Sequence, residues 1–138
     1  MLNSIYNIVM TICALSTGIG ASGVAIIRIS GEEASKVIET LTGKKVPNPR
    51  VATLRKINKI NTSELIDEGL VLWFPGPESY TGEDMAEIQV HGSKAVVDAL
   101  HSSLSDIENC RLAEPGEFTK LAFPVSYTHL TLPTICSV

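Results

Sequence analysis

Four side chains that could carry acid–base or metal chemistry lie close together in the middle of the chain: Glu83, Asp84, Glu87 and His91. On a helix they would occupy positions i, i+1, i+4 and i+8, a stripe that could hold a divalent metal or act as an acid–base site. The ordinary alternative for such acids is a solvated loop. The chemistry therefore depends on the element that carries them.

The residues around Glu87 favour a strand over a helix. Glycines bound the segment on both sides, and strict alternation would separate the residues into two faces. One face holds Ala86, Ile88 and Val90, and the other holds Met85, Glu87 and Gln89. Burying a carboxylate and an amide without partners costs free energy. We therefore predict that the face with Glu87 is turned toward a ligand.

A second charged residue interrupts an otherwise apolar strand predicted over residues 24–30. Arg28 shares one face of this strand with Val24 and Ile26. Its charge cannot be removed and its desolvation is costly, so it needs an anionic partner. That partner is either a carboxylate of the chain or a group on a ligand, and the sequence leaves both alternatives open.

The elements that must position these residues are predicted from periodicity and turn signals. A capping box from Ser30 to Glu33 opens a helix that Gly43 ends, and Ser93 caps a second helix running to about Ser105. A tight turn entering a further helix follows at residues 113–120. Strands are predicted over residues 8–15, 24–30, 51–57, 65–74, 85–90 and 110–112. So few helices cannot cover both faces of a parallel sheet, so we predict an α+β fold with a mixed β-sheet packed with two to three helices.

Other candidate groups favour structural roles. The loop over residues 16–23 has three glycines but no Gly-Lys-Ser/Thr ending, which makes it weak as a phosphate cradle. His91 is more often structural than catalytic at such a junction, and His101 is predicted to lie on the surface. The three cysteines lack CxxC spacing, which indicates buried thiols in a reducing cytosol. They are Cys13, Cys110 and Cys136.

Length and composition indicate one globular domain. The chain has 138 residues, of which 44% are hydrophobic and 19% charged. The net charge of −4 argues against a domain that binds nucleic acid by itself. The basic cluster over residues 44–59 is most simply a solvated surface. The apolar start over residues 5–15 is too short to span a bilayer. We therefore expect a cytoplasmic protein without a membrane anchor.

Four separated motifs, taken in order, resemble the N-terminal domain of the tRNA-modification GTPase family MnmE, also called TrmE. The resemblance covers about residues 8–123, and four motifs in the right order are a specific signal. They are Gly-Val-Ala-Ile-Ile-Arg-Ile-Ser-Gly at 23–31, Phe-Pro-Gly-Pro-Glu-Ser-Tyr-Thr-Gly-Glu-Asp at 74–84, Glu-Ile-Gln-Val-His-Gly at 87–92 and Leu-Ala-Glu-Pro-Gly-Glu-Phe-Thr-Lys at 112–120.

The resemblance implies a fold, a cofactor and partners. The domain would be a homodimerising module similar to the folate-binding domain of the aminomethyltransferase of glycine cleavage. It would bind 5,10-methylene- or 5-formyl-tetrahydrofolate, and the matching positions for the folate contacts are Arg28 and Glu87. The full-length family uses GTP, Mg²⁺ and K⁺. Together with an MnmG-type flavoprotein, it modifies C5 of the wobble uridine of certain tRNAs.

The chain departs from the family pattern in three ways. It contains no Gly-x-x-x-x-Gly-Lys-Ser/Thr, so it cannot bind GTP by the family's route, and it lacks the Cys-containing motif of the family's helical domain. After Phe123 the family's run with a folate-contacting lysine is replaced by residues 124–138, which resemble translated sequencing adapter. We therefore expect a domain over residues 1–123 followed by a non-native tail.

Three hypotheses about function follow. The first is a truncated domain that binds tetrahydrofolate and dimerises without being catalytic alone. The second is a stand-alone small enzyme that uses Glu83, Asp84, Glu87 and His91 as a metal or acid–base site. The third is a fragment that dimerises as a scaffold but does not bind folate.

Overall fold

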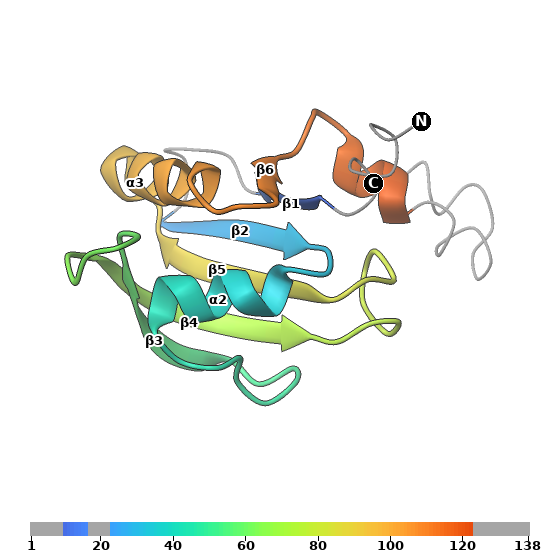
Figure 1. Cartoon of the computed structure of the whole chain (residues 1–138), viewed down its shortest axis with the longest axis horizontal. Helices are drawn as coiled ribbons and strands as arrows, with labels where there is room; N and C mark the ends of the chain where they lie inside the picture. The colour runs from blue at the N-terminus through green and yellow to red at the C-terminus, as the bar shows by residue number, and fades with distance from the viewer. Residues whose placement is uncertain (1–9, 17–22, 123–138) are drawn as a thin grey trace.

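The computed structural model describes residues 10–16 and 23–122. Its elements follow the order predicted from the sequence (Figure 1). They are β1 (Thr11–Leu15), β2 (Val24–Ser30), α2 (Ala34–Thr42), β3 (Thr53–Asn58), β4 (Leu65–Phe74), β5 (Met85–His91), α3 (Lys94–Ser105) and β6 (Cys110–Leu112). A short helix follows at residues 117–122. Most of the glycine-containing loop and the predicted tail at 124–138 lie outside the described residues.

The strands form one mixed sheet in the order β3-β4-β5-β2-β1-β6. All neighbouring pairs are antiparallel except β1 and β6, which are parallel. The predicted α+β fold with a mixed sheet is therefore confirmed. The pairing of β2 with β5 at the centre has a direct consequence for the site, because it sets Arg28 opposite Glu87.

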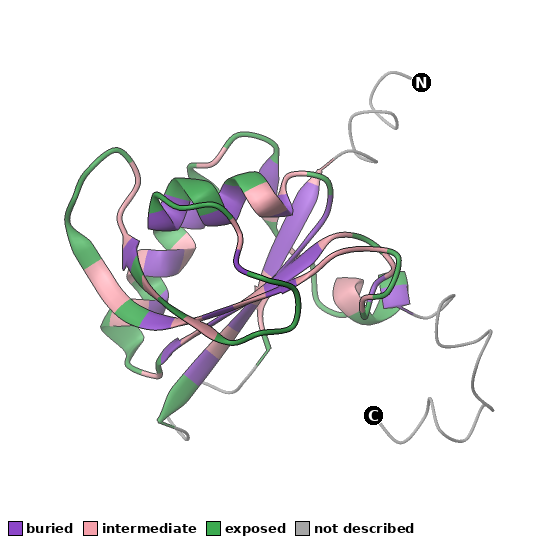
Figure 2. Cartoon of the chain, turned by 90° about the horizontal axis from the view of Figure 1, so that it is seen from below, coloured by how far each residue is buried: buried purple, intermediate pink, exposed green. Residues whose placement is uncertain are grey.

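One face of the sheet forms the core with both long helices. Alternate residues of the central strands, such as Ile27, Ile88 and Val71, pack in one cluster with Leu41 of α2 and Leu100 of α3. Each helix has a buried side and an exposed side, as is typical of an amphipathic helix that packs on a sheet (Figure 2). The longest helix, α3, has 12 residues, and no helix in the described ranges is long and apolar enough to cross a membrane.

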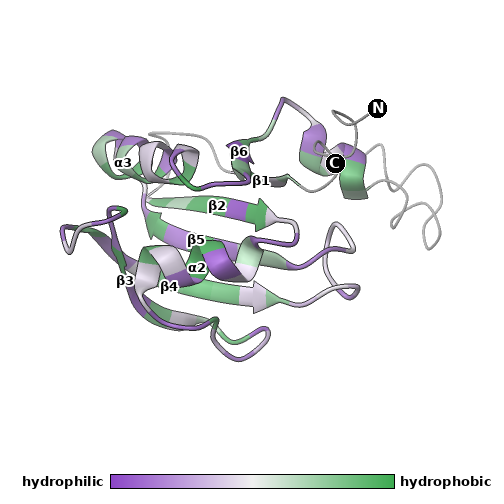
Figure 3. Cartoon of the chain, in the orientation of Figure 1, coloured by the Kyte–Doolittle hydropathy of each residue, from purple (hydrophilic) through white to green (hydrophobic). Residues whose placement is uncertain are grey.

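The opposite face of the sheet carries no helix among the described residues. It combines Arg28 and Glu87 with aliphatic side chains from β3 and β4, so the central strands are hydrophobic with polar interruptions (Figure 3). One end of this face is covered by the turn over residues 75–84, whose Thr81 hydrogen-bonds to Ser30. For this reason Met85, which the alternation grouped with the polar residues, is buried.

The two helices begin in different ways. The hydroxyl of Ser93 accepts a hydrogen bond from the N–H of Val96, which confirms the predicted cap of α3. The capping box predicted at Ser30 is wrong, because β2 continues through Ser30 and keeps it extended. The N-cap residue of α2 is Glu33, and its side chain makes no capping hydrogen bond. The N–H of Glu33 donates instead to the hydroxyl of Thr11 in β1 at 2.9 Å, so a distant strand holds the start of the helix.

The predicted end of α2 is confirmed. Gly43 adopts the left-handed conformation, with φ of 71°, and its N–H donates to the carbonyl of Glu39. A side chain disfavours this conformation, so glycine is the natural residue at this position.

Candidate functional site

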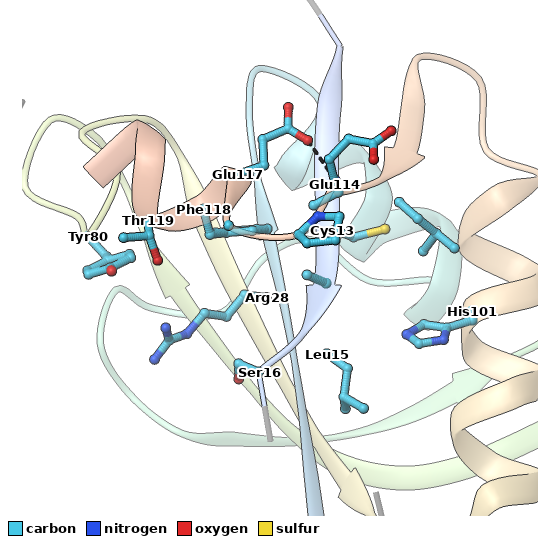
Figure 4. Close-up of a pocket in the computed structure, with 15 residues that line it drawn as sticks. Cys13, Leu15, Ser16, Arg28, Tyr80, His101, Glu114, Glu117, Phe118 and Thr119 are labelled. Atoms are coloured by element: carbon cyan, nitrogen blue, oxygen red, sulfur yellow. Dashed lines mark hydrogen bonds between the residues drawn. The ribbon is translucent and has the colours of Figure 1, made fainter. Parts of the chain in front are cut away.

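A pocket of about 450 Å³ opens between the end of β1, the β2 side chain Arg28, α3 and the two turns that flank them (Figure 4). This volume lies within the usual range for small-molecule sites. Its lining combines apolar side chains with a few polar and aromatic groups. The residues used below are Arg28, Tyr80, His101, Glu117 and Phe118.

Arg28 and Glu87 form an ion pair on the open face of the sheet. Arg28 Nε donates to Glu87 Oε2 at 3.0 Å, and the two side chains are 36% and 16% exposed. The internal carboxylate partner that the sequence left open is therefore present. Within the described part of the chain the two terminal nitrogens of Arg28 have no hydrogen-bond partner, so they can donate to a ligand. Arg28 lines the pocket and links it to Glu87.

Tyr80 extends this group of side chains. The centre of its ring lies 5.4 Å from Arg28 Cζ, which is within the range of a cation–π contact. The sequence gave no prediction for the role of Tyr80, because this residue lies in a turn without periodicity. Its signal was the Ser-Tyr-Thr-Gly motif within residues 74–84, which lies between the strands predicted over residues 65–74 and 85–90.

Another part of the pocket wall is formed by the turn that follows β6. Arg111 binds Glu117 through two parallel hydrogen bonds of 2.9 and 2.5 Å, and Glu117 also accepts the N–H of Glu114 at 2.8 Å. The hydrogen bond from Arg111 lowers the pKa of the Glu117 carboxyl below its usual value. These bonds close the turn that brings Phe118 to the pocket. The sequence predicted the turn, but it gave no indication that Arg111 would form an ion pair with Glu117 in it.

His101 was predicted to lie on the surface, and this prediction is wrong. His101 is half-buried and lines the pocket, and its Nε2 is buried without a hydrogen-bond partner among the described residues. The reason is helical spacing: His101 lies four residues after Val97 and three before Leu104, both of which are buried. The helical spacing between His101 and the apolar residues Val97 and Leu104 could have predicted its burial from the sequence.

The metal or acid–base stripe is not formed. Residues 85–91 are a strand, and the four side chains have separate partners. Glu83 accepts a hydrogen bond from Ser30, Asp84 from the N–H of Gly76, Glu87 from Arg28, and His91 pairs with Asp67. Across residues 10–16 and 23–122 no group of three or more His, Cys, Asp or Glu side chains could hold a metal ion.

His91 has the structural role that its position suggested. Its backbone N–H and ring Nδ1 both contact Oδ2 of Asp67 at 2.9 Å. Partial burial would raise the pKa of Asp67, but the hydrogen bonds from His91 outweigh it and lower that pKa. The pair joins the start of β4 to the end of β5.

The two cysteines that the structure describes are buried free thiols, as predicted. Cys13 and Cys110 lie on neighbouring strands with their sulfurs 4.0 Å apart. Cys136 lies outside the described residues.

Comparison with known proteins adds a family to this geometry. A family profile described as "GTP-binding protein TrmE N-terminus" matches residues 11–126. The tRNA modification GTPase MnmE of Pelagibacter ubique (strain HTCC1062) is 75% identical over 114 residues, which are 83% of this chain and 26% of that protein.

Relatives are also found in eukaryotes. The mitochondrial tRNA modification GTPase mss1 of Schizosaccharomyces pombe is 53% identical over 115 residues, 82% of this chain and 23% of that protein. The mitochondrial 5-taurinomethyluridine-[tRNA] synthase subunit GTPB3 of Danio rerio is 46% identical over 121 residues, 88% of this chain and 24% of that protein. The chain thus spans about a quarter of the length of these relatives. It belongs to the family of the TrmE N-terminal domain of tRNA modification GTPases.

Proposed function

We propose that this chain is the tetrahydrofolate-binding and dimerising module of a cytoplasmic tRNA modification GTPase, with Arg28 and Glu87 as its cofactor-binding residues. The observation that carries the proposal is the Arg28–Glu87 ion pair beside a pocket of about 450 Å³. A reduced folate needs a site that combines flat apolar walls with hydrogen-bonding groups. The pocket supplies both.

The chemistry of the two residues suits the two kinds of polar group on a folate. One oxygen of Glu87 is engaged by Arg28, and the other can accept N–H donors of a pterin ring. The terminal nitrogens of Arg28 can donate to a carbonyl or carboxylate oxygen. Because each side chain already holds the other in place, ligand binding does not cost the conformational entropy of ordering them.

The buried Nε2 of His101, which has no hydrogen-bond partner among residues 10–16 and 23–122, is a second sign that the pocket suits a polar ligand. A buried nitrogen without a partner costs free energy, so native structures seldom leave one unless another group completes it. The one-carbon chemistry itself would come from the cofactor, 5,10-methylene- or 5-formyl-tetrahydrofolate. This chain would bind and orient that cofactor.

The remaining parts of the reaction lie outside the matched quarter of the relatives. We place GTP, Mg²⁺ and K⁺ in a separate G domain of the full-length protein, in line with the GTPase names of the bacterial and yeast relatives. The substrate would be C5 of the wobble uridine in tRNA, with an MnmG-type flavoprotein as partner. The net charge of −4 supports this division, because the domain alone is not built to grip RNA.

The open face of the sheet is the surface we assign to the second copy of the chain. Leu54 of β3 is 59% exposed, and Leu70 and Leu72 of β4 are half-buried on the same face. Aliphatic side chains gathered on one face of a sheet are typical of an interface between subunits.

Calorimetric titration of the chain with 5-formyl-tetrahydrofolate, at protein concentrations that span monomer and dimer, tests the proposal. We expect saturable binding with one ligand per protomer. A folded dimer that shows no heat of folate binding would contradict the folate assignment and support the scaffold hypothesis instead. A monomer that binds folate would contradict the dimer assignment alone.

A further inference from the structure

Aromatic residues are few in this chain, and two of them lie at the pocket. The described residues contain four aromatic side chains: Trp73, Phe74, Tyr80 and Phe118. Trp73 is buried, whereas Tyr80 and Phe118 line the pocket and Tyr80 remains 43% exposed. An aromatic ring that a fold holds open beside a pocket offers a flat surface on which a conjugated ring can stack.

Tyr80 also contacts the residue that would bind the ligand's polar groups. The Arg28 side chain extends toward Tyr80 in Figure 4, with Cζ at 5.4 Å from the centre of the ring. Glu87 holds the same guanidinium through Nε at 3.0 Å. Two contacts on different parts of the group fix its plane, and they leave its terminal nitrogens for a ligand.

The turn that carries Tyr80 is anchored to the strand that carries Arg28. Ser30, two residues after Arg28, donates a hydrogen bond to Glu83 at 2.9 Å and shares one of 2.7 Å with Thr81. Ser30 and Thr81 are both buried. The same turn is closed by the hydrogen bond of 2.9 Å from the N–H of Gly76 to Asp84. The position of Tyr80 over Arg28 is therefore set by the fold.

We propose that Tyr80 is a ligand-recognition residue of this pocket. Its ring holds the Arg28 guanidinium in the plane that presents the terminal nitrogens, and with Phe118 it supplies the aromatic surface for the flat ring of the ligand. This inference rests on the proposed folate binding and deepens it. It assigns a role to the Ser-Tyr-Thr-Gly turn, which the two charged residues leave unexplained.

The test compares Tyr80→Phe and Tyr80→Leu in the whole chain, by titration with 5-formyl-tetrahydrofolate. Phenylalanine keeps the ring, so we expect its dissociation constant to stay within about twofold of the unsubstituted chain. Leucine removes the ring, so we expect binding about tenfold weaker, from the loss of stacking and of the cation–π contact. Leu65→Ser is the control, because Leu65 is 52% exposed and lies at the far end of β4, outside the pocket lining.

A second readout separates recognition from a general loss of structure. The Arg28 side-chain N–H resonance in the NMR spectrum should move in Tyr80→Leu, because the ring current is lost, and should be restored in Tyr80→Phe. Equal folate affinity in the unsubstituted chain and Tyr80→Leu would overturn this inference alone. A Tyr80→Phe variant as weak as Tyr80→Leu would also overturn it, since the hydroxyl and not the ring would then matter. No binding by the unsubstituted chain would overturn the proposed function together with this inference.

Discussion

Charged residues on a sheet face show how chemistry and stability compete at the scale of single residues. Arg28 and Glu87 satisfy one another, so neither carries the full cost of an unpaired partly buried charge. Both remain partly exposed, so the pair adds little to stability by itself. A pair that contributes modestly to folding and lies at a pocket is well suited to recognise a ligand.

Glu87→Gln should weaken 5-formyl-tetrahydrofolate binding by more than about 1 kcal/mol without unfolding the domain, because one charge-assisted hydrogen bond is lost. Calorimetric titration measures the affinity, and thermal unfolding reports the fold. Glu39→Gln on the exposed side of α2 removes the same charge away from the pocket and should leave binding unchanged. Unchanged affinity in a folded Glu87→Gln variant would contradict the assignment.

Glu117 gives a prediction about pH. The hydrogen bond from Arg111 lowers the folded-state pKa of Glu117 below its ordinary value of 4.5. The ion pair therefore stabilises the fold above that value, and the contribution is lost as the pH falls through the folded-state pKa. Glu117→Gln should lower the free energy of unfolding by about 1 kcal/mol at pH 7, with the gap closing below pH 4.5. Urea denaturation of both proteins at pH 7, 5 and 3 checks this, and a gap independent of pH would refute it.

At the scale of elements, close approach of strands constrains residue choice as firmly as charge does. The buried Gly69 lies in β4 against β5, and a Cβ added there would stand 2.2 Å from the carbonyl oxygen of Gln89. Backbone cannot yield to relieve that contact without breaking the ladder between the two strands. These strands position Glu87, so the site depends on this packing.

Gly69→Ala should therefore lower the free energy of unfolding by about 1–3 kcal/mol, as overpacking in a rigid place does. Gly23→Ala is the matched control, since a Cβ at Gly23 would meet no atom of the described residues within 4 Å. Its effect should stay within about 0.5 kcal/mol. Denaturant unfolding of both variants decides the point, and equal stability of the two would show that the ladder can relax around the added methyl group.

The N-termini of the two helices show what can and cannot be predicted from local sequence. Ser93 caps α3 within its own segment, so its role followed from a short stretch of sequence. The start of α2 is held by Thr11, 22 residues before Glu33, whose N–H donates to the Thr11 hydroxyl. No local pattern contains that contact, and Ser30 was instead taken up by the turn over residues 75–84.

At the scale of the whole molecule, the sheet is covered on one face by helices and left open on the other within the described residues. The open face contains both the Arg28–Glu87 pair and the aliphatic side chains of β3 and β4. If two copies meet there, the Arg28–Glu87 pair of the ligand site lies on the same face as the interface. Folate binding and dimerisation would then influence one another by mass action.

Leu54→Lys should shift the chain from dimer to monomer, because it places a charge in the proposed interface while leaving the core untouched. Leu54 is 59% exposed, so the fold should survive. Thr40→Lys is the control, because it adds the same charge on the exposed side of α2, a helix that packs on the opposite face of the sheet. Sedimentation equilibrium of both variants measures the change, and a Leu54→Lys dimer as stable as that of the control would exclude this face as the interface.

The sequence by itself determined the order of the elements, the α+β class and the residues facing each side of β2 and β5, because periodicity and turn residues act within a few positions. It also identified Arg28 and Glu87 as polar residues on sheet faces. The family resemblance added the folate assignment, which remains a prediction.

Only the tertiary structure decided which residues meet. The register of β2 against β5 paired Arg28 with Glu87, and the turn over residues 75–84 brought Tyr80 to the same place. The ion pair between Arg111 and Glu117 and the burial of His101 Nε2 also depend on how the segments pack in three dimensions. Such contacts join residues far apart along the chain, and they form only when burial of a common core holds the segments together.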